Sequence, residues 1–213
     1  MARDELGLGA HPHAGGRIAV CAGSHMGRLP AYRAAAQDMG HLLAAEGLEL
    51  LFGGTRDGLM QVVADAVKAG GGKVIGVLPK GAWPDLFYPC DERWEVEAGA
   101  GALSRRKGLM ISRADAVIAL PGGLGSLDEL TEVLTLVHLK EQTKPIGLLN
   151  TASFYLPHLA LLDHLYEEGF VDVPPRTYLL VERDPALLLQ RILAHPHWLF
   201  NTSLARHTTG GKP

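Results

Sequence analysis

Short runs of consecutive apolar residues alternate along this chain with longer runs in which apolar residues recur every three or four positions. The first pattern is typical of strands that are buried on both faces of a sheet, and the second is typical of helices with one buried side. The expected strands are 17–21, 48–52, 73–78, 116–120, 145–149 and 178–182. The expected helices begin near Pro30, Leu59, Leu103, Ser126, Tyr155 and Pro185. The alternation predicts an α/β fold, a Rossmann-like doubly wound parallel sheet in three α/β/α layers.

A single domain is expected to hold all of these elements. The 213 residues, of which 47% are hydrophobic, are enough to bury a full core, and we place the domain at 17–200. Residues 1–16 and 201–213 show no periodic pattern, so we expect a flexible leader and a flexible tail. Residues 79–100 combine aromatic side chains with prolines and acids, and we expect an irregular loop there.

Charge and composition argue against several classes of function. The formal net charge of -3 leaves no basic excess, so no nucleic-acid partner is expected. No apolar stretch approaches the roughly eighteen residues of a membrane span, and the N-terminus lacks a signal-peptide core, so we expect a cytoplasmic protein with no membrane partner. The two cysteines, Cys21 and Cys90, fit a reducing compartment. The ten histidines show no metal-ligand spacing, and we expect neither a metal nor a cofactor.

The segment PGGLGSLDEL, at 121–130, joins an expected strand to an expected helix through three glycines. Gly122, Gly123 and Gly125 allow a positive φ and bring bare backbone close to a ligand. The helix that follows starts with N–H groups that have no partner within the helix. Such a helix start binds anions, so we expect a phosphate group at this loop.

Two common phosphate-binding motifs do not fit the chain. A P-loop requires G-x-x-x-x-G-K-[ST], and no lysine follows Gly125. A dinucleotide-binding dehydrogenase requires G-x-G-x-x-G after the first strand and an acid about twenty residues further on. The first loop offers only Gly23 and Gly27, and the second strand ends in FGG, at 52–54, without an acid. Neither class of nucleotide-binding protein is therefore favoured.

A different set of motifs matches a known family. PGGLGSLDE resembles the motif PGGxGTxxE, and RRKGLM, at 105–110, resembles an Arg-Lys segment that accompanies it, with a fifteen-residue step from Arg106 to Pro121. CAGS and GGTRDGLM resemble two further loops of the same proteins. The chain is therefore similar, from about Ile18 to Leu193, to the LOG-like ("lonely guy") family. Its members are cytokinin riboside 5′-monophosphate phosphoribohydrolases, historically labelled lysine decarboxylases.

The resemblance implies hydrolysis of the N-glycosidic bond of a nucleoside 5′-monophosphate, which releases a free base and ribose 5-phosphate. It implies that Arg106 and Glu129 are catalytic. A carboxylate suits this chemistry because cleavage passes through a cationic, oxocarbenium-like sugar. Arg106 would either assist departure of the base or orient the phosphate and Glu129 through its planar fork. The substrate- and phosphate-binding residues expected from the matching loops are Gly23, Ser24, Gly54, Thr55, Lys107, Gly122, Gly123, Gly125 and Ser126.

Two alternatives stay open at this point. Ser126 and Glu129 also form an S-x-x-E capping box, in which the two side chains only satisfy amides at the helix start. Proteins that resemble this family carry nucleotide-like ligands, including molybdenum cofactor, so a non-catalytic binding or carrier protein is the alternative function. The family also implies a homodimer or a higher homo-oligomer, and the apolar helices around 101–140 are candidates for the contact.

The departures from the family pattern leave the base undetermined. Ser126 stands in place of the usual threonine and keeps its hydroxyl. Ser104 and Arg105 stand where a histidine and an acid often precede the Arg-Lys segment, and we expect Arg105 to be the solvated arginine. Residues 56–57 alter the second glycine loop, and the loop at 80–101 is rearranged. The leaving group is then an N6-prenylated adenine, plain adenine or another base.

Overall fold

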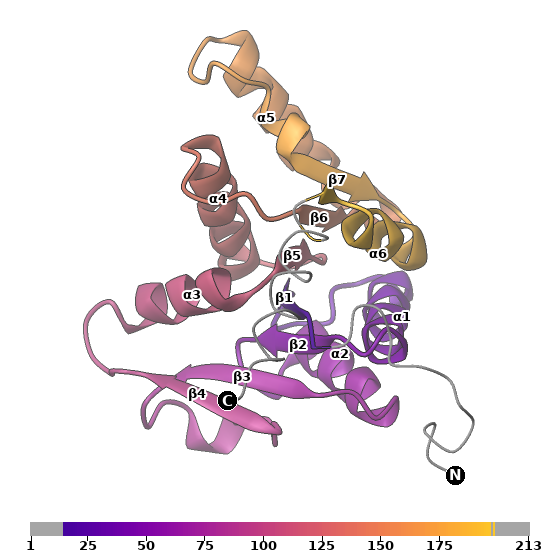
Figure 1. Cartoon of the computed structure of the whole chain (residues 1–213), viewed down its shortest axis with the longest axis vertical. Helices are drawn as coiled ribbons and strands as arrows, with labels where there is room; N and C mark the ends of the chain where they lie inside the picture. The colour runs from indigo at the N-terminus through magenta and orange to yellow at the C-terminus, as the bar shows by residue number, and fades with distance from the viewer. Residues whose placement is uncertain (1–14, 197, 199–213) are drawn as a thin grey trace, which may run out of the picture.

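The computed structural model describes residues 15–196 and residue 198, and a seven-stranded sheet lies at its centre (Figure 1). The strands pair in the order β4-β3-β2-β1-β5-β6-β7, and every pair is parallel. Their bounds are β1 Arg17–Cys21, β2 Glu49–Phe52, β3 Val74–Pro79, β4 Glu92–Val96, β5 Ala116–Ala119, β6 Ile146–Leu149 and β7 Leu179–Glu182. β3, β5 and β6 are buried along their whole length, which is why their sequences are continuous apolar runs.

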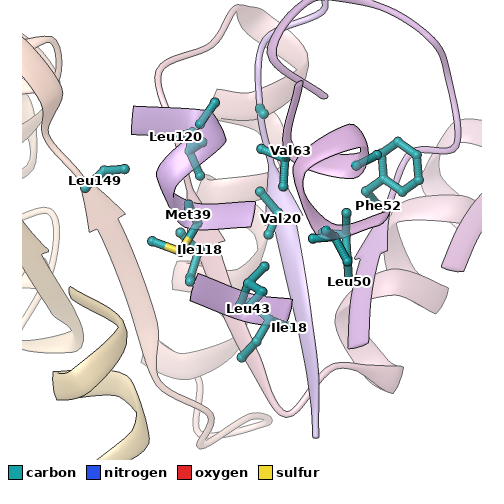
Figure 2. Close-up of a cluster of buried hydrophobic side chains, with 14 of the residues drawn as sticks. Ile18, Val20, Met39, Leu43, Leu50, Phe52, Val63, Ile118, Leu120 and Leu149 are labelled. Carbon is teal, nitrogen blue, oxygen red and sulfur yellow. The ribbon is translucent and has the colours of Figure 1, made fainter. Parts of the chain in front are cut away.

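In the described part of the chain, the helices α1 to α6 cover the two faces of this sheet. Their bounds are α1 Pro30–Ala45, α2 Gly58–Ala69, α3 Ala102–Arg113, α4 Leu124–His138, α5 Leu156–Glu167 and α6 Pro185–Leu193, and the 3-10 helices are η2 Pro84–Leu86, η3 Thr151–Ser153 and η4 Pro175–Tyr178. α1, α2 and α6 pack on one face, against strand residues such as Ile18, Leu50 and Ile118 (Figure 2). α3, α4 and α5 pack on the other, against alternate residues such as Ala19 and Val117. The expected doubly wound α/β/α fold is confirmed.

The expectation of an irregular segment at 79–100 is wrong for its second half, where β4 pairs with β3. β4 lies at the edge of the sheet, and its residues alternate between partly buried and exposed. Its sequence, ERWEV, carries charges that are paired along the edge: Lys73 contacts Glu92 at 2.6 Å, and Arg93 contacts Glu95 at 2.7 Å. Charged side chains are typical of edge strands because they discourage pairing with other chains. Because of these charges, the segment lacks the continuous apolar run from which the other strands were predicted.

Ala152, between β6 and α5, holds a left-handed backbone with φ of 50°. A side chain in that conformation costs roughly 1–2 kcal/mol, part of which glycine would recover. Replacement of Ala152 by glycine is therefore expected to raise the free energy of unfolding by about 0.5–1 kcal/mol. The matched control is Ala160→Gly, at an exposed position inside α5, which is expected to lower it by about 1 kcal/mol. Denaturant unfolding measures both changes, and an Ala152→Gly protein that is less stable than the parent would contradict the assignment of strain.

Candidate active site

The candidate site lies where the two halves of the sheet diverge. β1 and β5 are neighbours, but the chain leaves β1 toward β2 and leaves β5 toward β6. In open α/β sheets, ligands bind in the crevice at such a point, beyond the carboxyl ends of the strands. The two loops touch there, since the Gly23 N–H donates a hydrogen bond to the Pro121 carbonyl at 3.2 Å. The Tyr155 hydroxyl donates to the Leu120 carbonyl at 2.6 Å and so fixes the end of β5 to the start of α5.

Position 122 requires glycine because there is no room for a side chain, and not because of its backbone conformation. Gly122, Gly123 and Gly125 allow a positive φ, but none of the three adopts one. A Cβ on Gly122 would lie 2.1 Å from Ser126 Oγ and 3.0 Å from the Gly23 nitrogen. The absence of a side chain therefore lets the β1 loop, the β5 loop and the first turn of α4 meet at one point.

α4 begins at Leu124, two residues earlier than the pattern predicts. Its N-cap is Gly123, which has no side chain to bond to the first-turn amides. A capping box needs its serine at the N-cap and its glutamate three residues later, whereas Ser126 and Glu129 lie inside the helix. The capping-box alternative is therefore wrong. The first-turn amides carry no side-chain cap from the N-cap residue, which is the condition an anion site needs.

Arg106 on α3 and Glu129 on α4 form the charged centre of the crevice. Arg106 Nη2 donates to Glu129 Oε1 at 3.3 Å, and the two side chains are only 17% and 13% exposed. Arg106 Nε is buried and makes no hydrogen bond within the described part of the chain. An unpaired buried donor costs free energy, so Arg106 Nε is a donor that a ligand in the crevice could use.

Burial raises the pKa of the Glu129 carboxyl above its ordinary value. The charge of Arg106 and hydrogen bonds from Cys21 and Arg106 lower the pKa and partly offset that effect. Cys21, the last residue of β1, is itself buried, and its thiol pKa is raised well above the ordinary value by burial and then by Glu129. A carboxylate whose pKa is raised accepts a proton more readily than an exposed one, which suits a general base.

A cavity of about 420 Å³ contains this pair. Seven of the residues expected from sequence line it, namely Ser24, Thr55, Arg106, Gly123, Gly125, Ser126 and Glu129. They come from the ends of β1, β2 and β5 and from α3 and α4. The volume lies within the range of about 300–1,000 Å³ that is typical of small-molecule sites.

The other expected residues lie around this cavity and not in its lining. Gly23 and Gly122 line a second cavity of about 240 Å³, which adjoins the first at Ser24 and Gly123. Gly54 lines neither cavity and has φ of 76°, and a Cβ there would lie 2.8 Å from Leu78 Cδ1. Gly54 therefore shapes the turn that carries Thr55 to the cavity wall.

The two basic neighbours of Arg106 have partners of their own. Lys107 Nζ contacts Asp128 Oδ2 and Glu132 Oε2, each at 2.6 Å, and so ties α3 to α4 outside both cavities. Its part in phosphate binding stays a prediction. Arg105 is exposed, as expected, but it donates to the carbonyls of Ala100 at 2.9 Å and Glu97 at 2.8 Å. It therefore holds the loop before α3 in place.

Several lining residues were not predicted from sequence. They are Ala22, Asp57, Met60, Trp83, Leu86, Leu103 and Leu124. Asp57 and Met60 belong to the recognised segment GGTRDGLM, which was sufficient to point to them. Trp83 and Leu86 belong to a segment without periodicity, and Trp83 holds a left-handed φ of 45° that no sequence pattern indicates.

Replacing Arg106 by methionine is expected to shift the acidic limb of the pH–activity profile to higher pH. The Arg106 charge lowers the pKa of Glu129, so its removal leaves the effect of burial less opposed. Activity that needs the Glu129 carboxylate is lost as the pH falls through that pKa, and in the variant this loss begins at a higher pH. Residual kcat/KM measured against pH tests the shift. The control is Arg113→Met, an exposed arginine at the end of the same helix; an acidic limb that does not move relative to this control would contradict the coupling.

Among residues 15–196 and 198, no group of three or more His, Cys, Asp or Glu side chains is arranged to hold a metal ion. No helix in that part of the chain combines the length and apolar character needed to cross a membrane.

The sequence matches known proteins over most of its length. A family model described as "Possible lysine decarboxylase" matches residues 60–192. The probable cytokinin riboside 5′-monophosphate phosphoribohydrolase LOGL5 of Oryza sativa subsp. japonica is 40% identical over 176 residues, which are 83% of this chain and 71% of that protein. The rice enzyme LOG is 44% identical over 155 residues, 73% of this chain and 63% of that one. LOG4 of Arabidopsis thaliana is 41% identical over 165 residues, which are 78% of this chain and 76% of that protein.

Solved structures with the same fold include two molybdenum-cofactor proteins. The molybdenum cofactor binding protein of Rippkaea orientalis superposes with a TM-score of 0.61 at 26% identity, covering 84% of this chain and 95% of that one. The molybdenum cofactor carrier protein of Chlamydomonas reinhardtii gives a TM-score of 0.61 at 20% identity, covering 85% and 99%. At 20% identity, the likeness to the Chlamydomonas reinhardtii protein shows the fold alone.

Proposed function

Because this chain belongs to the LOG family, we propose that it hydrolyses the N-glycosidic bond of a nucleoside 5′-monophosphate, such as AMP or an N6-modified AMP. The products are a free base and ribose 5-phosphate. The curated relatives are named as cytokinin riboside 5′-monophosphate phosphoribohydrolases. One observation carries the proposal: the partly buried Arg106–Glu129 pair and the uncapped start of α4 line the same cavity.

The phosphate and the sugar are assigned to neighbouring parts of this cavity. The first-turn amides of α4 bind the 5′-phosphate, each such helix-end interaction contributing on the order of 0.3–2 kcal/mol. This contact fixes the ribose beside Glu129 and so converts binding into orientation of the glycosidic bond. Ser24 and Thr55, on the facing wall, supply hydroxyl groups to the same space.

Glu129 acts as a carboxylate during cleavage. It stabilises the cationic sugar that forms as the bond to the base breaks, and it accepts a proton from the attacking water, whose oxygen bonds to C1′. The electron pair of the broken bond leaves with the base, which takes up a proton from solvent, and Glu129 then releases to solvent the proton that it accepted. Arg106 either donates to a ring nitrogen of the base or orients the phosphate and Glu129, and its unpaired Nε is a donor available for either role.

The direct test is incubation of the purified protein with AMP and with N6-isopentenyl-AMP, followed by chromatography for the free base and for ribose 5-phosphate. Release of base from at least one substrate is the expected result, and the ratio of the two rates gives the base preference. Measurable nucleotide binding without any released base would overturn the hydrolase proposal.

A nucleotide-like carrier function is the second candidate, and the fold likeness to the molybdenum cofactor binding protein favours it. The Arg106–Glu129 pair favours the enzyme, because cleavage of a glycosidic bond needs a carboxylate in the cavity, whereas binding alone does not. Tight binding of molybdenum cofactor, together with intact nucleotides after incubation, would favour the carrier.

We also propose that the chain forms one domain over 17–200, and that it works in the cytoplasm as a homodimer or a higher homo-oligomer. Leu103 on α3, Leu124 on α4 and Leu139 directly after α4 are exposed by 57%, 86% and 58%. Contact with a second copy would remove these apolar surfaces from water. Light scattering after size exclusion is expected to give at least twice the chain mass of 22.8 kDa, and a monomer mass would contradict the proposal.

A further inference from the structure

Asp57 is the third charged side chain that lines the cavity, beside Arg106 and Glu129. It occupies the N-cap of α2, where an aspartate usually accepts a hydrogen bond from a first-turn amide. Asp57 makes no such bond, whereas Asp184, at the N-cap of α6, accepts one from the Leu187 N–H at 2.8 Å. The same residue type at the same helical position thus caps one helix of this chain and leaves the other uncapped.

The Asp57 carboxylate has no partner among the residues that the structure describes. Arg106 is the one cation in the cavity lining, and it is paired with Glu129. The adjacent Arg56 is exposed and donates to the Asp85 carbonyl at 3.2 Å. A partly buried carboxylate whose two oxygens are both unused is an acceptor for a ligand that brings O–H or N–H donors.

The start of α2 is held in a fixed position relative to the phosphate loop. The Leu59 N–H donates to the Gly23 carbonyl at 2.9 Å, and the Gly23 N–H donates to the Pro121 carbonyl at 3.2 Å. A Cβ on Gly58 would lie only 2.3 Å from the His25 nitrogen, so α2 starts in direct contact with the β1 loop. Asp57 therefore follows β2 while the α4 start follows β5, with β1 between the two strands (Figure 1).

We propose that Asp57 accepts hydrogen bonds from the 2′- and 3′-hydroxyls of the substrate ribose, and that it selects ribonucleotides over 2′-deoxyribonucleotides. The proposal rests on the hydrolase function. A substrate held by its 5′-phosphate at α4 and cleaved beside Glu129 has its sugar within the cavity, and a cis-diol offers two donors to the two carboxylate oxygens. Trp83, Leu86 and Leu103 supply an apolar lining that suits the base.

The test compares kcat/KM for AMP and for 2′-deoxy-AMP in the parent protein, in Asp57→Ala and in Asp184→Ala. Removal of Asp57 is expected to reduce the preference for AMP by roughly 10- to 100-fold, the usual range for hydrogen bonds to a charged group. Most of this change is a loss with AMP. Because each protein is measured with both substrates, the intrinsic difference in bond strength between them cancels. Asp184→Ala also removes an N-cap aspartate, but it is expected to keep the parental preference.

Calorimetric binding of ribose 5-phosphate and 2-deoxyribose 5-phosphate to the same proteins separates the two proposals. If AMP is cleaved and the Asp57→Ala protein keeps the parental preference, the role of Asp57 is overturned and the hydrolase stands. If no nucleotide is cleaved but Asp57→Ala loses discrimination between the two sugar phosphates, the hydrolase falls and the sugar contact stands. If Asp57→Ala changes only the preference for AMP over N6-dimethyl-AMP, Asp57 binds the base amine and the ribose assignment is overturned.

Discussion

Replacement of Glu129 by glutamine is expected to lower turnover by roughly 10²–10⁴-fold, or about 3–5 kcal/mol of activation free energy. The amide keeps the size of the side chain but carries no charge to stabilise the oxocarbenium-like sugar and cannot accept a proton from water. The Glu129 side chain is only 13% exposed, so water cannot replace the charge that the substitution removes. Turnover of AMP or N6-isopentenyl-AMP, measured by release of the base, gives the effect.

The matched control for this prediction is Glu132→Gln on the same helix. Glu132 contacts Lys107 at 2.6 Å, is 31% exposed and lines neither cavity. Its replacement is expected to leave turnover within about twofold, because Glu132 does not line the cavity and Lys107 keeps its contact with Asp128 at 2.6 Å. Circular dichroism of both variants checks that the fold is kept. Parental turnover in a folded Glu129→Gln protein would show that the carboxylate has no part in the chemistry.

Replacement of Gly122 by alanine is expected to reduce kcat/KM by at least 100-fold and to destabilise the fold by roughly 1–3 kcal/mol, because the added methyl group overpacks the junction of three segments. The Cβ would lie 2.1 Å from Ser126 Oγ, so the first turn of α4 must move. A shift of about 1 Å at a substrate-positioning element can cost about 100-fold in rate. Activity assayed well below the unfolding temperature separates the kinetic loss from the loss of stability.

Gly108→Ala, inside α3, is the control for the addition of a methyl group. Apart from its chain neighbours and the nearby backbone of α3 itself, nothing lies within 4 Å of the position that its Cβ would take, and its φ is not positive. The change is expected to stabilise the protein by about 0.5–1 kcal/mol, because alanine favours a helix. A Gly122→Ala protein with parental activity and parental stability would show that the junction has more room than the structure indicates.

The sheet was predictable because its central strands are buried on both faces. Runs such as Ala116–Leu120 are apolar at every position, and glycines mark the turns between them and the helices. β4 was not predictable in the same way, because an edge strand has one neighbour and its charges pair with each other along the edge. Its identity as a strand depends on backbone pairing with the edge of β3, which is a property of the folded sheet and not of the segment ERWEV itself.

The charged centre of the site was predictable because Arg106 and Glu129 lie in sequence motifs of the family. The segments around Arg106 and Glu129 placed both residues in one cavity, although they are separated in sequence and lie on different helices. The reason for Gly122 was not predictable, because the restriction comes from the Ser126 side chain and from the Gly23 backbone in the next loop. That the Asp57 side chain does not cap α2 was also not predictable from sequence, since an aspartate before a helix usually caps it.

The two sides of the cavity come from separate stretches of the chain. The charged pair and the start of α4 lie within residues 102–138, whereas most of the facing wall lies within 55–86. Substitutions in the facing wall can therefore alter which nucleotide fits without displacing the reacting groups. Gly53, just before this stretch, behaves differently, because a Cβ there would lie 3.1 Å from Arg106 Nη2 and would disturb the charged pair. Proteins descended from this chain can therefore acquire new substrates through substitutions within 55–86, while residues 102–138 keep the charged pair unchanged.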